Sequence, residues 1–479
     1  METSEIELLI KKWNPHFENQ VKGEWVGKVP REKYMQRLWK VMDIRHIVIL
    51  TGVRRSGKST LMRQLMERLL QEGTHPENVL YLYFEDLLVQ KYLSQGSDLL
   101  EQFYAYYLEK YNPQGKVYLF LDELQGVKDF NRWLHTQYEF NRNIKFVVSG
   151  SRRSLIDSET ATLLTGRNVQ FDIYPFNFYE YLLVHNVKVY GSDTIEDIRA
   201  ANFSQTTAIL HHFGNFLYEG GYPEIVLAKT NESKSAIANG YYRDILTRDV
   251  INPNNIRNPR EIEVLGLQVL SDFTKTHTYR SLGQPQGLSV DTVKTYLEYF
   301  YKSYLLFESR HFSYKTKETH DVRRPIKIYV VDNGIRNFNT LNLRPDLGQC
   351  AENIVYMELA KNNAAIHYWK RKKEVDFVVF NPHLSFVNIS YTDQPHEREV
   401  EGMLEGLQEF HLDKGMVLTK NYFDTKKIDE KTIEFVPLWA WLILNGRVFF
   451  KETEAKILSE KPSSGAPVNF HRNLIENLT

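Results

Sequence analysis

The chain has 479 residues, a length typical of about three domains. Sixty Lys and Arg balance 60 Asp and Glu, and 42 % of residues are hydrophobic, so the composition is that of soluble globular protein without an overall field attracting nucleic acid or membrane. The single cysteine, Cys350, excludes an internal disulfide and a metal site built from cysteines. The N-terminus lacks the order of a signal peptide, and the most apolar stretch, 435–444, is half the length of a membrane-spanning helix. We therefore expect a cytoplasmic protein without a membrane segment.

The first motif is a glycine-rich loop between an expected strand and an expected helix. A continuous apolar run over residues 46–50 predicts a strand buried on both faces, and leucines at helical spacing follow the loop. In the pattern Gly-x-x-x-x-Gly-Lys-Ser, glycines let backbone N–H groups surround phosphates at a helix N-terminus, where the dipole favours anions. Lys58 would reach the β- and γ-phosphates, and the Ser59 hydroxyl would hold Mg²⁺. The expected ATP-binding residues of this loop are Gly52, Arg54, Arg55, Ser56, Gly57, Lys58, Ser59 and Thr60.

A pair of acidic residues follows a second apolar run, which begins at Val117 and ends in Asp122 and Glu123. An acid at the carboxyl end of a neighbouring parallel strand is where Mg²⁺ needs a second protein contact, which Asp122 would provide. Glu123 would then polarise the attacking water beside the γ-phosphate. An acid pair at a strand end is often only solvated, but after a phosphate-binding loop it indicates a nucleotide hydrolase.

Two further strands, over 79–84 and 144–151, extend the expected parallel sheet, and a fifth follows Arg167. The strand over 144–151 ends in Ser149 and Ser151, whose hydroxyls would sense the γ-phosphate or the attacking water; small residues in a tight turn give the same pattern. Arg167 would reach a nucleotide bound by the next subunit and stabilise transition-state charge as an arginine finger. A surface arginine has the same sequence signature, so both interpretations stay open.

Several of these motifs occur together in one known family. GVRRSGKST, LDELQ, SGSRRSL, LTGR, YPFNFYEYL and GGYPEIV, in this order, resemble a family of bacterial and archaeal AAA+ ATPases whose C-terminal half is described only as a domain of unknown function. The resemblance runs from about Arg31 to about Leu444. It implies an α/β fold with a P-loop AAA+ parallel sheet and a helical lid. A winged helix and a small α/β domain similar to a degenerate PD-(D/E)XK nuclease would follow.

The resemblance also implies residue roles and domain boundaries. The loop and the acid pair would form the nucleotide site, Arg167 would be the finger, and Arg31 and Tyr34 would lie on the segment leading toward the adenine. The expected boundaries are 1–30 for an N-terminal segment, 31–176 for the ATPase core, 177–258 for the lid and linker, 259–327 for the winged helix, 328–450 for the nuclease-like domain and 451–479 for a tail.

The expected winged helix is the main candidate for DNA contact. TYRSLGQPQGLSVDTVKTYLEYF predicts a helix-turn-helix with Gly287 at the turn and Ser289 as the helix cap. A basic stretch follows, which suits a wing lying on phosphates; a solvated hairpin, or a wing that contacts protein, is the alternative. A later basic run, 370–373, would also suit a phosphate backbone, although a charged hairpin tip has the same pattern. The candidate DNA contacts are Lys294, Lys315, Lys317, Arg323, Arg324, Lys370, Arg371 and Lys372.

KEVDFVVFNPHLSFVNISYT, residues 373–392, predicts two short strands joined by a polar turn. By the resemblance, Glu352 and Asp376 take the positions of the helix acid and the strand acid of a nuclease. The acid-x-lysine pair of such an enzyme falls on Asn388 and Ser390. Phosphodiester hydrolysis needs carboxylates that concentrate Mg²⁺ and a cation that steadies the nucleophile. Because neither Asn388 nor Ser390 carries a charge, we expect no nuclease activity.

The sequence therefore predicts a Mg²⁺-dependent AAA+ ATPase that binds ATP and self-associates into a ring or another oligomer. The leading hypothesis couples ATP hydrolysis to the binding or remodelling of duplex or branched DNA. The alternative is a slow regulatory ATPase that acts as a switch on a protein partner, without nucleic acid. DNA-stimulated turnover would favour the first hypothesis, and retained ATP with negligible turnover would favour the second.

Overall fold

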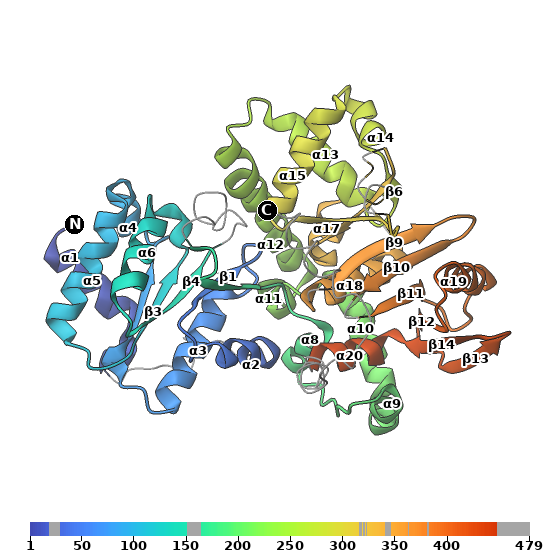
Figure 1. Cartoon of the computed structure of the whole chain (residues 1–479), viewed down its shortest axis with the longest axis horizontal. Helices are drawn as coiled ribbons and strands as arrows, with labels where there is room; N and C mark the ends of the chain where they lie inside the picture. Colours follow the sequence, from blue (N-terminus) through green and yellow to red (C-terminus); the bar gives the residue numbers. More distant parts are fainter. Residues whose placement is uncertain are drawn as a thin grey trace, which may run out of the picture. The chain divides into compact units, whose positions relative to one another are not determined.

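Five parallel strands form the sheet of the N-terminal half in the computed structural model (Figure 1). The strands expected here from the sequence are confirmed, and β1 is buried along its whole length because helices cover both faces of the sheet. In the spatial order β2-β3-β4-β1-β5, they are β1 (Ile47–Thr51), β2 (Val79–Tyr83), β3 (Val117–Asp122), β4 (Ile144–Ser149) and β5 (Asn168–Asp172). The structure describes residues 1–18, 29–150, 164–315, 319, 321, 323–340, 346–362, 364–380 and 383–447.

Helices cover the two faces of this sheet in a way that follows from the strand order. α3 (Lys58–Gln71) lies on one face, and α5 (Ser97–Tyr111) and α6 (Phe130–Phe140) lie on the other (Figure 1). Crossovers between parallel strands are right-handed. The chain runs in one direction along the sheet from β1 to β2 and in the other from β2 through β3 to β4, so α3 lies on the opposite face from α5 and α6. α2 (Glu32–Lys40) packs against α3, and the short α4 (Leu87–Gln90) follows β2.

The segment that begins with α1 (Thr3–Trp13) closes the open edge of the sheet at β2. The Asn14 side chain donates to the carbonyl oxygen of Tyr81 at 2.9 Å and accepts from the N–H of Tyr81 at 2.7 Å. His16 Nε2 lies 2.7 Å from the carbonyl oxygen of Val79. Side chains thus satisfy edge-strand backbone groups that would otherwise be open to another strand.

A helical region follows the sheet. Its first helix starts with a capping box, in which the Asn177 and Glu180 side chains each accept from the backbone N–H of the other residue. Its last helix continues without a break into the π-helical segment Ile245–Ile251. π-Helices are rare in proteins, and those that occur often lie at functional sites. The α-helices are α8 (Phe178–Val184), α9 (Ile195–Ala201), α10 (Thr206–Glu219), α11 (Pro223–Leu227) and α12 (Asn231–Asp244).

The next elements follow in the order helix, strand, helix, helix, strand, strand. The expected helix, turn and helix are present: Gly287 in the turn has a φ of 67°, and the Ser289 side chain accepts from the N–H of Thr292 at 3.1 Å. The elements are α13 (Pro259–Ser271), β6 (Thr276–His277), α14 (Tyr279–Gly283), α15 (Val290–Lys302), β7 (Leu306–His311) and β8 (Ile326–Val330).

These three strands belong to a larger mixed sheet in the order β13-β14-β12-β11-β10-β9-β7-β8-β6 (Figure 1). The expected boundary at 327/328 therefore falls inside β8 and inside one continuous sheet, because β7 pairs in parallel with β9. α18 and α19 pack on opposite faces of this sheet. The remaining elements are α17 (Asn333–Asn339), α18 (Leu347–Lys361), β9 (Ala365–Lys370), β10 (Glu374–Phe380), β11 (Leu384–Ser390), α19 (Glu397–Glu409), β12 (Lys414–Thr419), β13 (Asp424–Ile428) and β14 (Lys431–Pro437).

The most apolar stretch of the sequence spans the end of β14 and the start of α20 (Leu438–Arg447). α20 packs against α8 and α18, and its Trp439 and Leu442 side chains are buried. Its apolar character is therefore used inside the fold. Within the described ranges, no helix is long and apolar enough to cross a membrane.

Candidate nucleotide-binding site

The glycine-rich loop connects β1 to α3 through backbone that glycine alone adopts easily. Gly52 has a φ of 134°, and a Cβ atom there would lie 2.1 Å from the carbonyl oxygen of Ile173. Gly57 has a φ of 96° and immediately precedes the first residue of α3, so the first-turn N–H groups of that helix point to the loop. Ser59 and Thr60 lie in this first turn and are half-buried. The loop is thus built as an anion cradle at a helix N-terminus.

Lys58 is folded across this loop. Its Nζ atom donates to the carbonyl oxygens of Gly52 at 3.2 Å and Val53 at 3.0 Å, and only 4 % of the residue is exposed. The ammonium is therefore held over the loop, at the place where a phosphate would need a cation.

The acid pair lies at the end of β3, where the hydroxyls of two neighbouring strands reach it. Tyr81 on β2 and Ser149 on β4 both donate to the Asp122 carboxylate. The Ser149 Oγ atom also accepts from the N–H of Glu123 at 3.1 Å. The structure therefore joins Ser149 to both acids, while Ser151 lies outside the described residues. Tyr81 was not among the expected site residues, although its place on an adjoining strand could have suggested it.

Glu123 has left-handed backbone, with a φ of 57° and a ψ of 43°. Its side chain accepts from Gln125 Nε2 at 2.5 Å. Burial raises the pKa of the Glu123 carboxyl, and the negative charge of Asp122 adds to this effect, whereas the Lys58 ammonium opposes it. A strained, buried carboxylate beside a lysine is typical of functional positions.

Two arginines of the loop bind acids that the sequence analysis did not assign to the site. Arg54 Nη1 lies 2.9 Å from Glu85, directly after β2, and Arg54 Nε lies 2.9 Å from Asp249 in the π-helical segment. Arg55 lies 3.5 Å from Glu224 on α11. The loop is thereby connected to the helical region. Glu85 lies near the end of a strand, as Asp122 does, a signal that could have found it.

Arg31 and Tyr34 lie on the inner side of the loop. Arg31 is 2 % exposed, forms an ion pair with Glu180 at 2.8 Å and donates from Nη1 to the carbonyl oxygen of Ser56 at 2.9 Å. The Tyr34 hydroxyl accepts from the N–H of Tyr174 at 3.2 Å. These contacts tie the loop to α8, and a contact of Tyr34 with adenine stays a prediction.

Arg167 lies at the end of the sheet opposite to the loop. Its carbonyl oxygen accepts from the N–H of Ile47, the first residue of β1, at 2.8 Å. The loop follows the last residue of that strand, about 16 Å away at the rise of a β-strand. The Arg167 side chain is 36 % exposed and its Nε atom lies 2.8 Å from Glu139 at the end of α6. It therefore does not reach the loop of its own chain.

The two basic segments proposed for DNA contact come together in the second sheet. Because β7 pairs in parallel with β9, the connections that follow these strands begin at the same edge. His311 Nε2 at the end of β7 lies 3.2 Å from the carbonyl oxygen of Lys370 at the end of β9. Of the candidate DNA contacts, Lys315, Arg323, Arg324, Lys370, Arg371 and Lys372 lie in or beside these connections, and Lys317 lies outside the described residues.

Acidic side chains neutralise part of this basic surface. Arg323 Nη2 lies 2.8 Å from Asp321, and Arg371 Nη1 lies 2.7 Å from Glu409 on α19. Lys294, on α15, lies 3.7 Å from an acid of its own helix. The positive charge available to a phosphate backbone is therefore smaller than the count of basic residues indicates.

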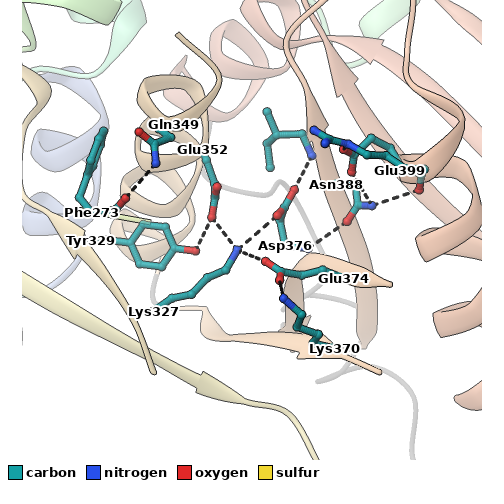
Figure 2. Close-up of polar contacts among 12 residues, drawn as sticks. Phe273, Lys327, Tyr329, Gln349, Glu352, Lys370, Glu374, Asp376, Asn388 and Glu399 are labelled. Atoms are coloured by element: carbon teal, nitrogen blue, oxygen red, sulfur yellow. Dashed lines mark hydrogen bonds and ion pairs between the residues drawn. The ribbon is translucent and has the colours of Figure 1, made fainter. Parts of the chain in front are cut away.

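The four positions compared with a nuclease have different surroundings, and Figure 2 shows three of them, Glu352, Asp376 and Asn388. Glu352 and Asp376 both bind Lys327. Asn388 is fully buried, and its Oδ1 atom accepts from the N–H of Asp376 at 2.9 Å. Ser390 accepts from the N–H of His396 at 3.3 Å, at the start of α19. The sequence analysis missed Lys327 because its strand lies in the part of the chain expected to form the winged helix.

The chain is similar to known domain families and known proteins. Residues 44–182 match the AAA domain family, and residues 210–346 and 347–441 match two domains of unknown function (DUF8612 and DUF4143). An uncharacterized protein of Haemophilus influenzae is 26 % identical over 422 residues, covering 86 % of this chain and 98 % of its own. The structure of a Walker-type ATPase of Pyrococcus abyssi is 14 % identical, with a TM-score of 0.38, and covers 65 % of this chain and 96 % of its own.

An uncharacterized protein of Methanocaldococcus jannaschii is 30 % identical over 414 residues, which cover 82 % of this chain and 88 % of its own. The order of the five strands, the glycine-rich loop and the matched AAA domain support ATPase activity. The chain, a P-loop ATPase with an AAA domain followed by two domains of unknown function, therefore belongs to the same family as the Methanocaldococcus jannaschii protein.

Proposed function

We propose that this protein hydrolyses ATP with Mg²⁺ at the loop between β1 and α3 and couples hydrolysis to DNA. The observation that carries the catalytic part is the arrangement of Lys58, Asp122 and Glu123 around one end of the parallel sheet. The residues fit the proposed ligands. Ammonium and helix N-terminal N–H groups suit phosphates, and the oxygens of Ser59 and Asp122 suit Mg²⁺.

Each residue of this site has a distinct proposed task. Lys58 would exchange the loop carbonyls for phosphate oxygens, and Ser59 and Asp122 would hold the metal, whose charge would offset that of the phosphates. Glu123 orients the attacking water and accepts its proton, a task that its raised pKa favours because a base works best with a pKa near the working pH. Ser149 donates to the Asp122 carboxylate and accepts from the N–H of Glu123, and so fixes the positions of the two residues. It is the proposed sensor.

A path from the loop to the C-terminal half supports the coupling. Arg54 binds Asp249, which lies in the π-helical segment after α12. That segment leads directly toward α13, the first helix of the region with the helix-turn-helix. Binding of phosphate beside Arg54 would compete with Asp249 for the guanidinium. Nucleotide in the loop would therefore change the contacts of the π-helical segment that leads to α13.

DNA as the partner is supported by topology and by the joined basic connections. The order helix, strand, helix, helix, strand, strand, with β7 and β8 as the last pair, is the order of a winged helix. Its wing would be the connection between β7 and β8, beside the connection between β9 and β10. Contacts from both connections to phosphates would give affinity without base specificity.

The second candidate is a switch that acts on a protein partner. It is favoured by the ion pairs of Arg323 with Asp321 and of Arg371 with Glu409, because neutralised side chains attract phosphates less. In that case the same connections would contact protein, and ATP turnover would not respond to nucleic acid.

Steady-state ATP hydrolysis tests both candidates. We expect wild type to hydrolyse ATP only with Mg²⁺, and Glu123→Gln to retain ATP binding while losing turnover by about 100-fold or more, the scale of a general base. Single-stranded, duplex and branched DNA are then added in turn. Stimulation of the wild type by one of these forms supports a DNA-coupled ATPase. Slow turnover that no DNA form changes rejects DNA coupling in favour of the protein switch, and unchanged turnover in Glu123→Gln rejects the assigned base.

A further inference from the structure

A buried lysine lies at the centre of three carboxylates in the second sheet (Figure 2). The Nζ atom of Lys327 lies 2.9 Å from Glu352 Oε1 and 2.6 Å from Glu374 Oε1. Asp376 Oδ1 lies 3.3 Å from the same Nζ atom, and the Lys327 side chain is only 3 % exposed. We call these three carboxylates, of Glu352, Glu374 and Asp376, the carboxylate cage.

The cage is assembled from segments that are far apart in the sequence. Lys327 comes from β8, Glu352 from α18, and Glu374 and Asp376 from β10. The pairing of β10 with β9 is irregular between Val375 and Val378, beside Asp376, and both acids of β10 reach the same Nζ atom. The ion pairs thus connect three elements: β8, α18 and β10, the central strand of the sheet.

Further hydrogen bonds fix the cage in position. The Tyr329 hydroxyl donates to Glu352 Oε1 at 2.9 Å, and the N–H of Ile389 donates to Asp376 Oδ2 at 2.9 Å. Asn388 accepts from the N–H of Asp376, and its Nδ2 atom donates to Glu399 Oε2 at 3.3 Å. The Asn388 amide is neutral, whereas a carboxylate at this position, as in the nuclease pattern, would add a further negative charge beside the cage.

The distances around Lys327 suit an ammonium and exclude a dissolved metal ion at the same point. Separations of 2.6–3.3 Å are those of N–H···O bonds. Mg²⁺ requires oxygens at about 2.0–2.1 Å and Ca²⁺ at about 2.3–2.6 Å. With Lys327 in place, no group of three or more His, Cys, Asp or Glu in the described part of the chain is arranged to hold a metal.

Charge makes the lysine necessary to the cage. Burial disfavours the Lys327 ammonium, but the carboxylates outweigh this effect, Glu352 most strongly, and its pKa is raised well above the usual value. Burial raises the pKa of Glu352 to about 7 even against the nearby ammonium. Without Lys327, three partly buried carboxylates would face one another and would need either protons or another cation.

We propose that the Lys327 ammonium occupies, as part of the chain, the position in which the carboxylate cage would otherwise hold a divalent cation. The cage is filled in the native protein and becomes a divalent-cation site when the ammonium is removed. The sheet is therefore held together across the expected domain boundary by an internal cation, independently of dissolved metal. This inference does not depend on the proposed ATP hydrolysis.

Mn²⁺ binding to the full chain without nucleotide tests the proposal. In calorimetric titrations, Lys327→Ala is expected to bind one more Mn²⁺ per chain than the wild type, and Mn²⁺ should raise its Tm while leaving the wild-type Tm unchanged. Adding Asp376→Asn to Lys327→Ala should weaken the new binding by about tenfold or more, because a neutral amide replaces one carboxylate ligand. The matched control is Lys370→Ala: Lys370 lies 3.0 Å from Glu374 but is half-exposed, so this variant should bind Mn²⁺ as the wild type does.

Each result decides the proposal. A folded Lys327→Ala that binds no more Mn²⁺ than the wild type overturns it, as does an additional Mn²⁺ bound by Lys370→Ala. Plasmid cleavage by the wild type with Mn²⁺, lost in Asp376→Ala, overturns it as well, because a metal would then share the cage with the lysine. If Lys327→Ala folds only when Mn²⁺ is present, the proposal is supported. If it fails to fold at any Mn²⁺ concentration, the cage does not accept the ion and the proposal is wrong.

Discussion

Gly52 and Glu123 both have a positive φ, and both lie at the candidate nucleotide site. Glu123, at a φ of 57°, has a conformation that costs a side chain of its kind about 1–3 kcal/mol. The bond from its N–H to Ser149 Oγ and the packing at the end of β3 hold it there. Gly52 has a φ of 134° and lies against the backbone of Ile173, where no side chain fits. The sheet edge thus maintains strained geometry where the proposed chemistry requires it.

Gly52→Ala is expected to lower the free energy of unfolding for two reasons: an unfavourable positive φ for alanine and a steric clash of the new side chain. The new Cβ atom would lie 2.1 Å from the Ile173 carbonyl oxygen, so β1 and β5 must separate locally. Gly73→Ala is the matched control, because Gly73 also has a positive φ, of 92°, but a Cβ atom there meets nothing within 4 Å. We expect Gly73→Ala to cost about 1–2 kcal/mol in denaturant unfolding and Gly52→Ala clearly more, with loss of ATP binding. Equal costs would mean that the close contact of Gly52 with Ile173 is relieved easily.

At the scale of elements, the strands of the first sheet could be predicted because each carries its own signal. β1 and β3 are apolar runs that end in a recognisable motif, and the loop after β1 has a fixed pattern of glycines. Lys58, which the loop pattern names, lies close enough to the end of β3 for its charge to act against the raised pKa of the Glu123 carboxyl. Local sequence was sufficient here because the chemistry lies where a strand ends.

The second sheet could not be assembled from the sequence in the same way. The pairing of β7 with β9 depends on contacts between segments more than fifty residues apart, which leave no local pattern. Lys327 is one basic residue in a basic stretch, and only the folded sheet shows that three acids surround it. Asp249 likewise lies next to Arg248 in the sequence, yet in the structure it binds Arg54. Long-range ion pairs are therefore the part of the site that sequence reasoning missed.

The segment after α1 gives a pH-dependent contribution to the stability of the sheet edge. Burial lowers the pKa of His16 to about 4, while the bond to the Val79 carbonyl oxygen opposes this shift only partly. In the unfolded chain a histidine has a pKa of about 6.5, so the unfolded state binds the proton more tightly. Stability is therefore full above pH 6.5 and decreases as the pH falls toward 4, by up to about 3 kcal/mol.

Denaturant unfolding at pH 7 and pH 5 measures this contribution. Between these values the wild type should lose about 2 kcal/mol more stability than His16→Gln, which keeps an N–H donor near Val79 but has no titrating ring. His75→Gln is the control, because the His75 side chain is 70 % exposed, and this variant should keep the wild-type pH dependence. Identical pH dependence of wild type and His16→Gln would show that protonation of His16 is not linked to folding.

At the scale of the whole molecule, a buried ion pair connects α2, beside the ATPase sheet, to α18, beside the second sheet. Lys33 on α2 lies 3.2 Å from Glu358 on α18, and both side chains are at most 5 % exposed. α18 also carries Glu352 of the carboxylate cage, two turns away along the same helix. Because removing one member of a buried pair leaves an uncompensated charge, this link favours a fixed arrangement of α2 and α18. Movement driven by ATP would then pass through Arg54 and Asp249, whose link a phosphate can replace.

Arg167 lies at the start of β5, far from the loop of its own chain. The nucleotide that it is proposed to contact is therefore one bound by a neighbouring chain. We expect Arg167→Ala and Lys58→Ala each to lose most ATP turnover, since the first lacks the finger and the second lacks the phosphate contact. Mixing the two variants should restore part of the activity. At a mixed interface, the intact loop of Arg167→Ala would meet the intact Arg167 of the Lys58→Ala chain.

The control is a mixture of Lys58→Ala with Glu123→Gln, which should stay inactive because both variants damage the same side of the interface. Wild-type turnover per chain should also fall on dilution, as subunits that complete one another separate. Turnover that is independent of concentration, together with a monomeric mass and no recovery in the first mixture, would mean that Arg167 acts only as a surface ion-pair partner of Glu139. Recovery in the first mixture alone would place a catalytic site at a boundary between two copies of the chain, because no single chain in that mixture has both a working loop and a working finger.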